Sequence, residues 1–370
     1  MTPEPPDPGP DPVGATRLDA LDLVPYRLAL RHPWRSARGL LRERRGWLAR
    51  ARSDGVHGYG DCTPLAEAGT ELMGAAHRAL QEACERLPGL PIESALRRRA
   101  PGSAMAPAAS HAVECALLDL QSRLAGVPLR RWILRAPGGT ASDWIEVNGA
   151  LGPAIQVTGE AVARALDSGY RVLKVKVGCA DRDAEIAHLV DLASALPAGA
   201  GLRLDANGAW DLETAQRVIA ACADLPIESL EEPLKRPDPE GLARLQALAP
   251  FPLALDESLV HWTGPAGARP LPVRRAVIKP AALGGVAASL RVAERLGRLG
   301  IEIVLTGMLE SAAGLWATAQ LAAAVGSPLA HGLATGSWLA QDLGPPPMPR
   351  MGRLHLPDCP GSGFEQLASQ

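Results

Sequence analysis

One pattern of hydrophobic and polar positions recurs between residues 171 and 280. A short apolar run ends on charged residues, and a segment with helical periodicity follows it. Such runs are typical of buried parallel strands that alternate with helices. The carboxyl ends of the strands in a (β/α) barrel form one rim, so the charged residues at these ends are predicted to converge there. The pattern occurs at Arg171–Gly178, Gly201–Gly208, Ile227–Pro233, Pro252–Ser258 and Ala276–Pro280.

The same alternation extends in both directions along the chain. Ile145–Leu151 is predicted to be the first barrel strand, Ile301–Thr306 the seventh and Pro328–Gly332 a poor eighth. Asp211 has the position and chemistry of a helix N-cap. Helices are predicted at Ile155–Ser168, Asp181–Leu196, Asp211–Ala223, Pro239–Leu248, Val286–Leu299 and Ala312–Val325.

The N-terminal part of the chain lacks this alternation. Leu18–Leu30 and Leu40–Ala51 predict strands, Gly55–Gly60 predicts turns, and helices are expected at Ala66–Arg86 and Met105–Ala125. Strands followed by helices indicate a separate α+β domain.

The predicted fold is therefore α/β: a modified (β/α) TIM-type barrel with an N-terminal α+β capping domain. The barrel is expected to span residues 136–335 and the capping domain residues 17–135. The many prolines of residues 1–16 predict a disordered tail, and residues 336–370 are expected to pack back on the capping domain.

Charge and composition exclude several classes of partner. With 38 basic and 40 acidic residues the formal net charge is −2, which provides no basic field for nucleic acid or an anionic membrane. No apolar run reaches the roughly 18 residues of a transmembrane helix, and the start of the chain lacks the order of a signal peptide. The six cysteines form no CxxC pair, which is typical of thiols in a cytoplasmic protein. We expect a cytoplasmic protein that acts on a small molecule.

Lysine is rare in this chain and concentrated on the predicted rim. Of the 38 basic residues four are lysines, and Lys174, Lys176 and Lys279 lie at the ends of predicted strands. Lysine can become a neutral proton acceptor, whereas arginine effectively cannot. Lys174 and Lys176 share one face of their strand, and repulsion, a nearby cation and partial burial are expected to lower their pKa values. One of them is therefore a candidate base.

Three carboxylates, Asp205, Glu231 and Asp256, end three consecutive predicted strands. Hard oxygen ligands without His or Cys favour Mg²⁺, and the neighbouring Glu232 and Glu257 are alternative ligands. Helix capping or pairing with Arg would also explain each acid taken singly. Ammonium groups on both sides of a metal-bound carboxylate suit proton abstraction next to that carboxylate, because both cations stabilise the enolate.

These residues carry a family resemblance that covers nearly the whole chain after the tail. The motifs KVKVG, LRLDANGAW, LEEP, ALDES and IKP resemble the enolase superfamily, whose members use a Lys or His base with one or two Mg²⁺ ions. Lysines on the second and sixth strands resemble the muconate-lactonising subgroup. Within it, LRLDANGAW, TGMLESAAG at 306–314 and GYGDCTPLAEAGTE at 58–71 resemble the o-succinylbenzoate synthases of menaquinone biosynthesis.

The resemblance implies a Mg²⁺-dependent syn-dehydration of 2-succinyl-6-hydroxy-2,4-cyclohexadiene-1-carboxylate, with Mn²⁺ as a substitute metal. Lys176 would remove the proton alpha to the carboxylate and return it to the leaving hydroxyl, while Lys279 would hold its charge against the enolate. Asp205, Glu231 and Asp256 would bind the metal. The loops Arg31–Leu41 and Pro64–Glu67 would form a lid. The implied substrate-binding residues are Lys174, Arg203, Asn207, Gly307, Glu310 and Ser311.

One segment departs from the pattern of such synthases. Where they often have a Ser-rich SSxES, this chain has Thr306–Ser311 (TGMLES), so backbone amides would have to replace hydroxyl contacts to the succinyl chain. N-acylamino acid racemases and dipeptide epimerases share the same lysines and ligands and remain an alternative. A Schiff-base barrel using Lys176 or Lys279, and a barrel without catalysis, are two further alternatives. His331 is interpreted as structural, and a substrate contact by Trp34 stays open.

Overall fold

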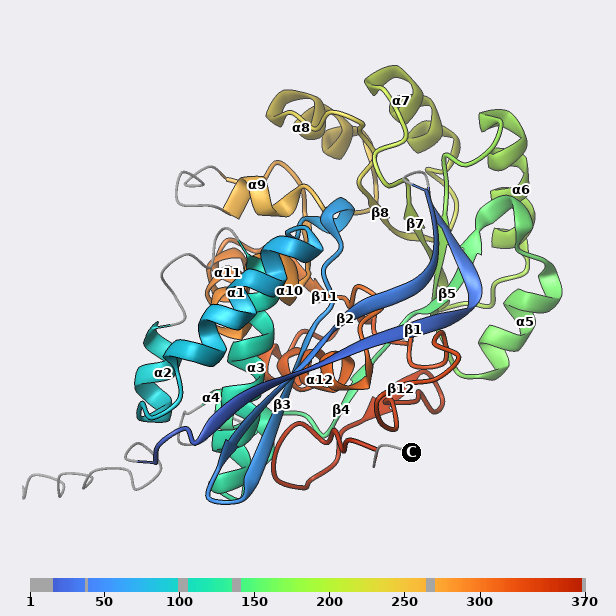
Figure 1. Cartoon of the computed structure of the whole chain (residues 1–370). Coiled ribbons are helices and arrows are strands. Elements are labelled where there is room, and N and C mark those ends of the chain that lie inside the picture. Colours follow the sequence, from blue (N-terminus) through green and yellow to red (C-terminus); the bar gives the residue numbers. More distant parts are fainter. Residues whose placement is uncertain (1–15, 37–38, 99–105, 135–140, 264–269, 368–370) are drawn as a thin grey trace, which may run out of the picture.

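A curled sheet of seven parallel strands forms the centre of the larger part of the molecule (Figure 1). The computed structural model describes residues 16–36, 39–98, 106–134, 141–263 and 270–367. Neighbouring strands follow one another in chain order, with β5 and β11 at the two ends of the sheet. The strands are β5 (Gly149–Pro153), β6 (Val172–Lys176), β7 (Gly201–Asp205), β8 (Ile227–Glu231), β9 (Leu253–Leu255), β10 (Arg275–Ile278) and β11 (Glu302–Leu305).

Helices connect these strands and cover the outside of the sheet, which confirms the predicted (β/α) barrel (Figure 1). Asp211 is the N-cap of α7, and its side chain accepts a hydrogen bond from the Thr214 amide at 2.8 Å, which confirms its predicted role. The predicted helix at Ile155–Ser168 is instead a short 3-10 turn followed by α5. The helices are η3 (Ala154–Gln156), α5 (Gly159–Asp167), α6 (Arg182–Ser194), α7 (Leu212–Ala221), α8 (Pro239–Leu248), α9 (Leu259–Thr263), α10 (Pro280–Leu283), α11 (Val286–Arg298) and α12 (Ala312–Val325).

The eighth position of the barrel is closed by two residues rather than by a full strand. His331 forms a parallel bridge with Val147, and Gly332 forms one with Thr306. The seven-stranded sheet is thereby joined into a ring of eight positions, as the weak signal at Pro328–Gly332 predicted. Strands four positions apart, such as β6 and β10, then stand on opposite walls.

The capping domain consists of a three-stranded antiparallel sheet and helices packed on it (Figure 1). The long β1–β2 hairpin reaches over the carboxyl ends of the barrel strands and approaches β5. Residues 1–15 of the proline-rich tail lie outside the described residues. The elements are β1 (Ala20–Ser36), β2 (Gly39–Ser53), β3 (Val56–Cys62), η1 (Ala66–Ala68), α1 (Met73–Arg86), α2 (Ile92–Arg98), α3 (Pro107–Leu124) and α4 (Leu129–Leu134).

The glycine-rich segment at residues 55–60 was wrongly predicted to form turns only. Asp54 and Gly55 make the turn, with φ of 49° and 75°, but Gly58 and Gly60 lie inside β3. A Cβ atom at Gly60 would stand 1.9 Å from the carbonyl oxygen of Ala112 on α3. These glycines therefore allow a strand and a helix to pack backbone against backbone. Helix α3 is accordingly buried on nearly every side instead of being amphipathic.

The C-terminal segment contacts both parts of the molecule. Strand β12 (Arg353–His355) pairs with β4 (Trp144–Glu146) on the barrel side. Phe364 is buried with Leu48 in one hydrophobic cluster, and Arg123 donates a hydrogen bond to the Phe364 carbonyl at 2.6 Å. The segment thus bridges the capping domain and the barrel.

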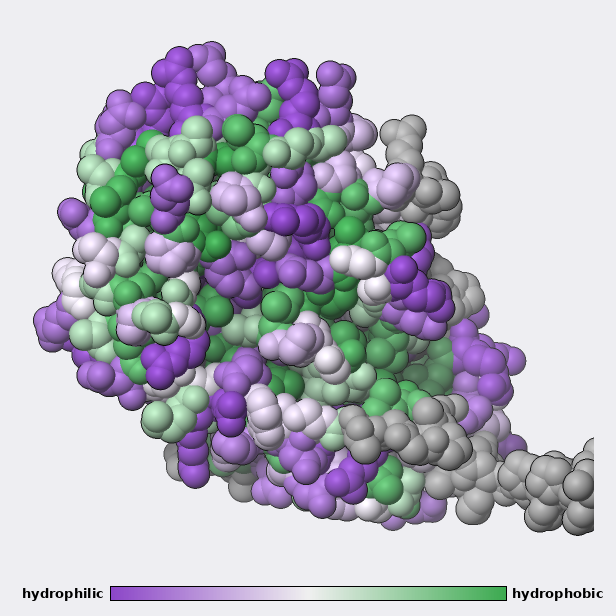
Figure 2. Space-filling model, turned by 180° about the vertical axis from the view of Figure 1, so that it is seen from behind, coloured by the Kyte–Doolittle hydropathy of each residue, from purple (hydrophilic) through white to green (hydrophobic). Residues whose placement is uncertain are grey.

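The outer surface is mixed in character on the face seen in Figure 2, with hydrophilic residues gathered along its upper edge. Within the described ranges, no helix has the length and apolar character needed to cross a bilayer.

The contact between β3 and α3 generates a prediction for stability. Gly60→Ala should destabilise the protein by about 1–3 kcal/mol, because the new methyl group overpacks a backbone contact. Gly297→Ala in α11 is the matched control: a Cβ there meets nothing within 4 Å, and the helix should gain up to about 1 kcal/mol. Urea unfolding of both variants measures the difference, and equal midpoints would contradict the packing argument.

Candidate active site

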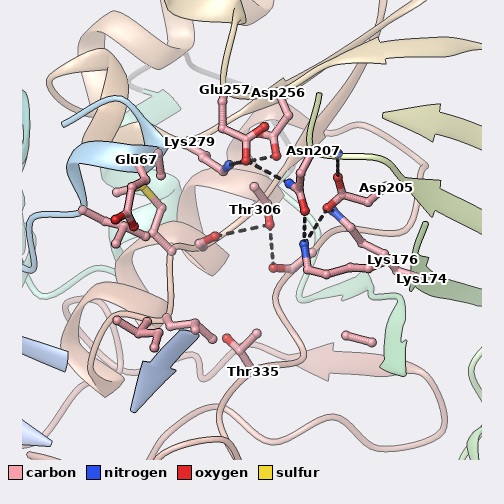
Figure 3. A pocket seen from close by; sticks show the side chains of 18 of the residues that line it. Glu67, Lys174, Lys176, Asp205, Asn207, Asp256, Glu257, Lys279, Thr306 and Thr335 are labelled. Atoms are coloured by element: carbon pink, nitrogen blue, oxygen red, sulfur yellow. Dashed lines mark hydrogen bonds and ion pairs between the residues drawn. The ribbon is translucent and has the colours of Figure 1, made fainter. Parts of the chain in front are cut away.

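A pocket of about 220 Å³ lies at the carboxyl ends of the barrel strands, beneath the capping domain. The barrel lines it with charged side chains from β6, β7, β9 and β10 (Figure 3). The loop before α12 adds residues 306–309. The capping domain closes it with Leu40, Leu41, Leu65, Glu67 and Ala68. All of these except Ala68 belong to the two segments expected to form a lid.

The two lysines of β6 point to the same side and meet carboxylates of the neighbouring strands. The Lys176 ammonium donates to Asp205 Oδ2 at 3.1 Å and to Asn207 Oδ1 at 2.5 Å. Lys174 lies 3.0 Å from Asp205 Oδ2 and forms a short hydrogen bond with Glu231. Its ammonium therefore bridges two of the three predicted metal ligands.

Lys279 stands on the opposite wall, directly after β10. Its ammonium donates to Asp256 Oδ2 at 2.8 Å and lies 3.5 Å from Glu257 Oε1. Glu257 in turn accepts a hydrogen bond from Asn207 Nδ2 at 3.1 Å. Asn207 thus touches groups associated with both walls (Figure 3), and its backbone takes a left-handed conformation with φ of 46°.

The electrostatics of the lysines differ from the expected lowering of their pKa values. Burial disfavours the charge of Lys174, but Asp205 and Glu231 outweigh it and hold its pKa above the usual range. The same balance of burial against Asp256 and Glu257 raises the pKa of Lys279. The expectation counted the neighbouring lysine and a cation but not these direct contacts with acids, which hold the pKa of Lys174 up.

The acids respond to the same contacts in opposite directions. Burial raises the pKa of Asp205, but Lys174 and Lys176 outweigh it, so this pKa lies below its ordinary value. Burial raises the pKa of Asp256 well above its ordinary value. Lys279 offsets this only in part, since Glu257 and Glu231 add like charge. An additional cation beside Asp256 would relieve that repulsion.

The three predicted ligands are buried, with exposed fractions of 2% for Asp205, 1% for Glu231 and 5% for Asp256. Among the described residues, no three His, Cys, Asp or Glu side chains already surround one point as a metal centre, since ammonium groups stand between the acids. Asp256 Oδ1 is buried without a hydrogen-bond partner. A set of hard oxygen atoms, one of them unsatisfied and the others held by cations, fits a divalent cation such as Mg²⁺.

The neighbouring glutamates have different surroundings. Glu232 turns away from the pocket, and its Oε1 accepts hydrogen bonds from the Asp256 amide at 2.6 Å and the Ser258 amide at 2.9 Å. It therefore orders the loop after β9, with a left-handed backbone at φ of 44°. Glu257 lines the pocket and stays an alternative ligand.

Arg203 does not line the pocket, in contrast to its expected role in substrate binding. It is fully buried below the rim, where its Nε donates to Glu228 Oε2 at 3.0 Å and lies 3.8 Å from Glu231 Oε1. Glu228 also accepts from Arg275 Nη1 at 2.5 Å. Positions 203 and 205 share a strand face, but the side chain of Arg203 lies one layer deeper in the barrel. Arg203 therefore supports the predicted metal ligand Glu231 and does not contact the space for a substrate.

Two further expected substrate contacts also lie outside the pocket wall. Gly307 lines the pocket, whereas Glu310 and Ser311 do not. Glu310 folds back on its own loop, where its Oε2 accepts from the Met308 amide at 2.5 Å. Ser311 precedes α12, and its amide donates to Asp61 of the capping domain at 2.7 Å. The loop itself therefore holds the Glu310 side chain, and the capping domain holds the Ser311 backbone.

Other residues of the wall were not singled out from the sequence. Asn148, Thr306 and Thr335 line the pocket, and only their places at strand ends could have indicated this. His331 is fully buried and outside the wall. Its Nδ1 accepts from the Leu305 amide at 3.0 Å, and burial with a contribution from Arg203 lowers its pKa to about 3, so the imidazole is neutral. The side chain of Trp34 lies outside the described part of the structure.

Comparison with known proteins identifies the family. Residues 157–368 match the family model described as enolase C-terminal domain-like. Residues 21–133 match that of the mandelate racemase and muconate lactonizing enzyme N-terminal domain. The chain belongs to the enolase superfamily. Its place in the muconate-lactonising subgroup agrees with lysines on both β6 and β10.

Relatives of this enolase superfamily chain include enzymes with different activities. It is 28% identical over 298 residues to a hydrophobic dipeptide epimerase of Roseobacter litoralis, covering 80% of this chain and 85% of the relative. It is 31% identical over 249 residues to an o-succinylbenzoate synthase of Desulfotalea psychrophila, covering 64% of each. Members of this family therefore catalyse more than one reaction.

Solved structures of superfamily members have the same fold. Muconate lactonizing enzyme from Pseudomonas fluorescens, complexed with muconolactone, is 26% identical with a TM-score of 0.83, covering 95% of this chain and 97% of that one. Dipeptide epimerase from Enterococcus faecalis, complexed with Mg and L-Leu-L-Tyr, is 25% identical with a TM-score of 0.83, covering 94% and 99%. Both were solved with a small molecule bound.

The buried ion pairs below the rim generate a prediction for pH dependence. Burial raises the pKa of Glu228, but Arg203 and Arg275 outweigh it and lower the pKa from 4.5 to about 2. A lowered pKa stabilises the fold above the ordinary value, and this stabilisation is lost as the pH falls towards 2. The shift corresponds to about 3 kcal/mol. Glu228→Gln should therefore be less stable near neutral pH and lose less stability on acidification than the parent protein.

Urea unfolding between about pH 5 and pH 2 measures this difference. Glu302→Gln is the matched control, because Glu302 pairs with Arg275 but its side chain is 42% exposed. Its pH profile should run close to that of the parent protein. Parallel profiles for all three proteins would contradict the assigned role of Glu228.

Proposed function

We propose that this enolase superfamily protein is an o-succinylbenzoate synthase, which dehydrates 2-succinyl-6-hydroxy-2,4-cyclohexadiene-1-carboxylate by proton abstraction alpha to a carboxylate. The observation that carries the proposal is the pairing of Lys176 and Lys279 on opposite walls of one pocket, with three buried acids between them. The synthase relatives and the motifs around Asp61, Asp205 and Glu310 support this reaction, and epimerase and cycloisomerase relatives are equally similar.

The proposed roles follow from the contacts of each side chain. Lys176, in its neutral form, accepts the alpha proton of the substrate and passes it to the departing hydroxyl, so that water leaves and the ring becomes aromatic. Asn207 accepts a hydrogen bond from the Lys176 ammonium and fixes its direction. Lys279, on the far wall, keeps its charge and stabilises the negative charge that develops in the transition state.

A divalent cation belongs to the proposal. Asp205, Glu231 and Asp256 would hold Mg²⁺, or Mn²⁺ in its place, and the ion would supply positive charge beside the substrate carboxylate. Lys174 bridges Asp205 and Glu231 and would have to yield part of this position. We assign it to substrate carboxylate binding, together with Asn207 and Gly307 at the pocket wall.

A racemase of N-acylamino acids is the second candidate. The same disposition of Lys176 and Lys279 on opposite walls would let one amine remove and the other return a proton. A dipeptide epimerase belongs to the same candidate, because a hydrophobic dipeptide epimerase is among the relatives and the acids Glu67 and Glu257 line the pocket.

The direct test is an assay of the purified protein with Mg²⁺ and the proposed substrate. We expect loss of the cyclohexadiene and formation of o-succinylbenzoate. Lys176→Arg should lower this rate by about 10²–10⁴, because the charge is kept but the proton acceptor is lost. Lys235→Arg is the matched control, since Lys235 is exposed and should leave the rate unchanged.

The same samples distinguish the second candidate. N-acylamino acids incubated in deuterated water would exchange the alpha hydrogen if the protein is a racemase. Exchange without any dehydration would overturn the synthase proposal in favour of racemisation. Full activity of Lys176→Arg in either reaction would show that Lys176 is not the base.

The metal generates a prediction that does not depend on turnover. Mg²⁺ should stabilise the protein against heat, by about 2.7 kcal/mol at a concentration 100 times its Kd, and a chelator should reverse the shift. Asp256→Asn should weaken the shift strongly. Asp211→Asn is the control, since Asn also caps helices and Asp211 caps α7 outside the pocket wall. An equal shift in both variants would exclude Asp256 as a ligand.

A further inference from the structure

A buried carboxylate of the capping domain reaches across to the barrel. Asp61, at the end of β3, is 3% exposed and accepts hydrogen bonds from two hydroxyls and one backbone amide. Its Oδ1 accepts from the Tyr26 hydroxyl in a short hydrogen bond and from Thr63 Oγ1 at 2.6 Å. Its Oδ2 accepts from the Ser311 amide at 2.7 Å. Ser311, which donates this hydrogen bond, lies 250 positions further along the chain than Asp61.

The amide that Asp61 binds belongs to the start of α12. Ser311 is the N-cap residue of this helix, but its side chain makes no capping hydrogen bond. Asp61 instead supplies the negative charge that a helix N-terminus favours. Asp342 accepts from the next amide, Ala312, at 2.8 Å. The first turn of α12 is therefore held by carboxylates from two distant segments.

Arg44 makes a second link between the same two regions. It is 3% exposed, and its Nε donates to the Leu309 carbonyl at 3.2 Å. Its Nη2 donates to the Thr63 carbonyl at 2.7 Å, and Nη1 to that of Pro64 at 3.4 Å. Leu309 has a left-handed backbone with φ of 59°, a conformation that persists when the surroundings impose it.

The fit of the two surfaces requires a glycine. Gly314 lies in the first turn of α12, where alanine is normally preferred by about 1 kcal/mol. A Cβ at this position would stand 3.0 Å from Asp61 Cβ and 2.7 Å from Glu310 Cγ. The absence of a side chain at position 314 lets the capping domain approach the helix closely.

The loops joined by Asp61 and Arg44 both line the pocket. Residues 306–309 form part of its barrel side, and Leu65, Glu67 and Ala68 form part of its lid. We propose that Asp61 is a positioning residue, which with Arg44 presets the distance between these two loops and thereby determines which substrates fit. Asp61 is absent from the pocket lining, so it acts through the Ser311 amide and the loop before it.

This inference rests on the proposed function only for its kinetic consequence. Replacement of Asp61 by Asn keeps an oxygen for the Ser311 amide and lets the NH₂ group donate to the Tyr26 and Thr63 hydroxyls, but it removes the negative charge at the N-terminus of α12. The loop at residues 306–311 should then move more freely. KM for the substrate should rise about tenfold while kcat changes less than about threefold, because Lys176, Lys279 and the acids keep their places.

The chain offers a matched control in Asp119. This carboxylate of α3 is fully buried. It accepts from the Tyr59 amide at 3.0 Å, the Ser362 amide at 2.5 Å and Arg123 Nε at 2.9 Å. Asp119→Asn also removes a buried negative charge, and it places an NH₂ group among partners that only donate, so it disturbs a contact of the same kind with the C-terminal segment. None of these partners lines the pocket. A general loss of stability should therefore appear in both Asp61→Asn and Asp119→Asn, whereas a change in the pocket should appear only in Asp61→Asn.

The experiment compares Asp61→Asn, Asp119→Asn and the parent protein by hydrogen exchange and kinetics. Asp61→Asn should lose protection at the amides of residues 308–312 and raise KM, whereas Asp119→Asn should keep both values. Arg44→Lys, which keeps the charge but not the fork of donors, provides a second variant should Asp61→Asn fail to fold. It is expected to lose protection in the same loop.

Unchanged protection in this loop in both Asp61→Asn and Arg44→Lys would overturn the inference. An equal rise of KM in Asp61→Asn and Asp119→Asn would also overturn it, because the effect would then be general destabilisation. If the parent protein does not dehydrate the proposed substrate, the proposed function fails by itself. The exchange measurement still decides whether Asp61 holds the loop.

Discussion

The structure depends on the balance of charge in the middle of the barrel. Carboxylates taken out of water are costly unless they are paired with cations or well hydrogen-bonded, and here Asp205, Glu228, Glu231 and Asp256 each have an amine or a guanidinium beside them. Asp205 meets both lysines of β6, Asp256 meets Lys279, and Glu228 lies between two arginines. Parallel strands make this possible, because they bring residues distant in sequence to one rim.

The same balance explains why lysine and arginine occupy different depths. The arginines form the lower layer, where Arg203 and Arg275 share Glu228 and their side chains are at most 3% exposed. A planar guanidinium with several donors satisfies such a place without needing to change its charge. The lysines form the upper layer and face the pocket, where an amine that exchanges protons is useful. The scarcity of lysine elsewhere in the chain is therefore consistent with chemistry at the rim.

The barrel and its charged rim were predictable because their signals are local. An apolar run that stops on Asp205 or Lys176 specifies a strand, its end and the face of its side chain, whatever lies elsewhere in the chain. The roles of Glu232 and Glu257, the acids that follow two predicted metal ligands, were harder to predict. Sequence alternation alone did not show that Glu232 orders a loop while Glu257 stays at the pocket. The hydrogen bonds that decide this come from the backbone of another strand.

Contacts between the two domains were not predictable from local pattern. The side chain of Glu310 is held by an amide of its own loop and the backbone of Ser311 by Asp61. The glycines of β3 are required by a helix 50 or so residues later. A motif shows which residues lie near a site, but the packing of the other domain decides which of them face it. The charged pairs are rigid parts of the barrel wall, while the lid and the loop before α12 form the rest of the pocket. Reaction type therefore follows from the barrel, and the choice of substrate follows from how closely the capping domain is held against it.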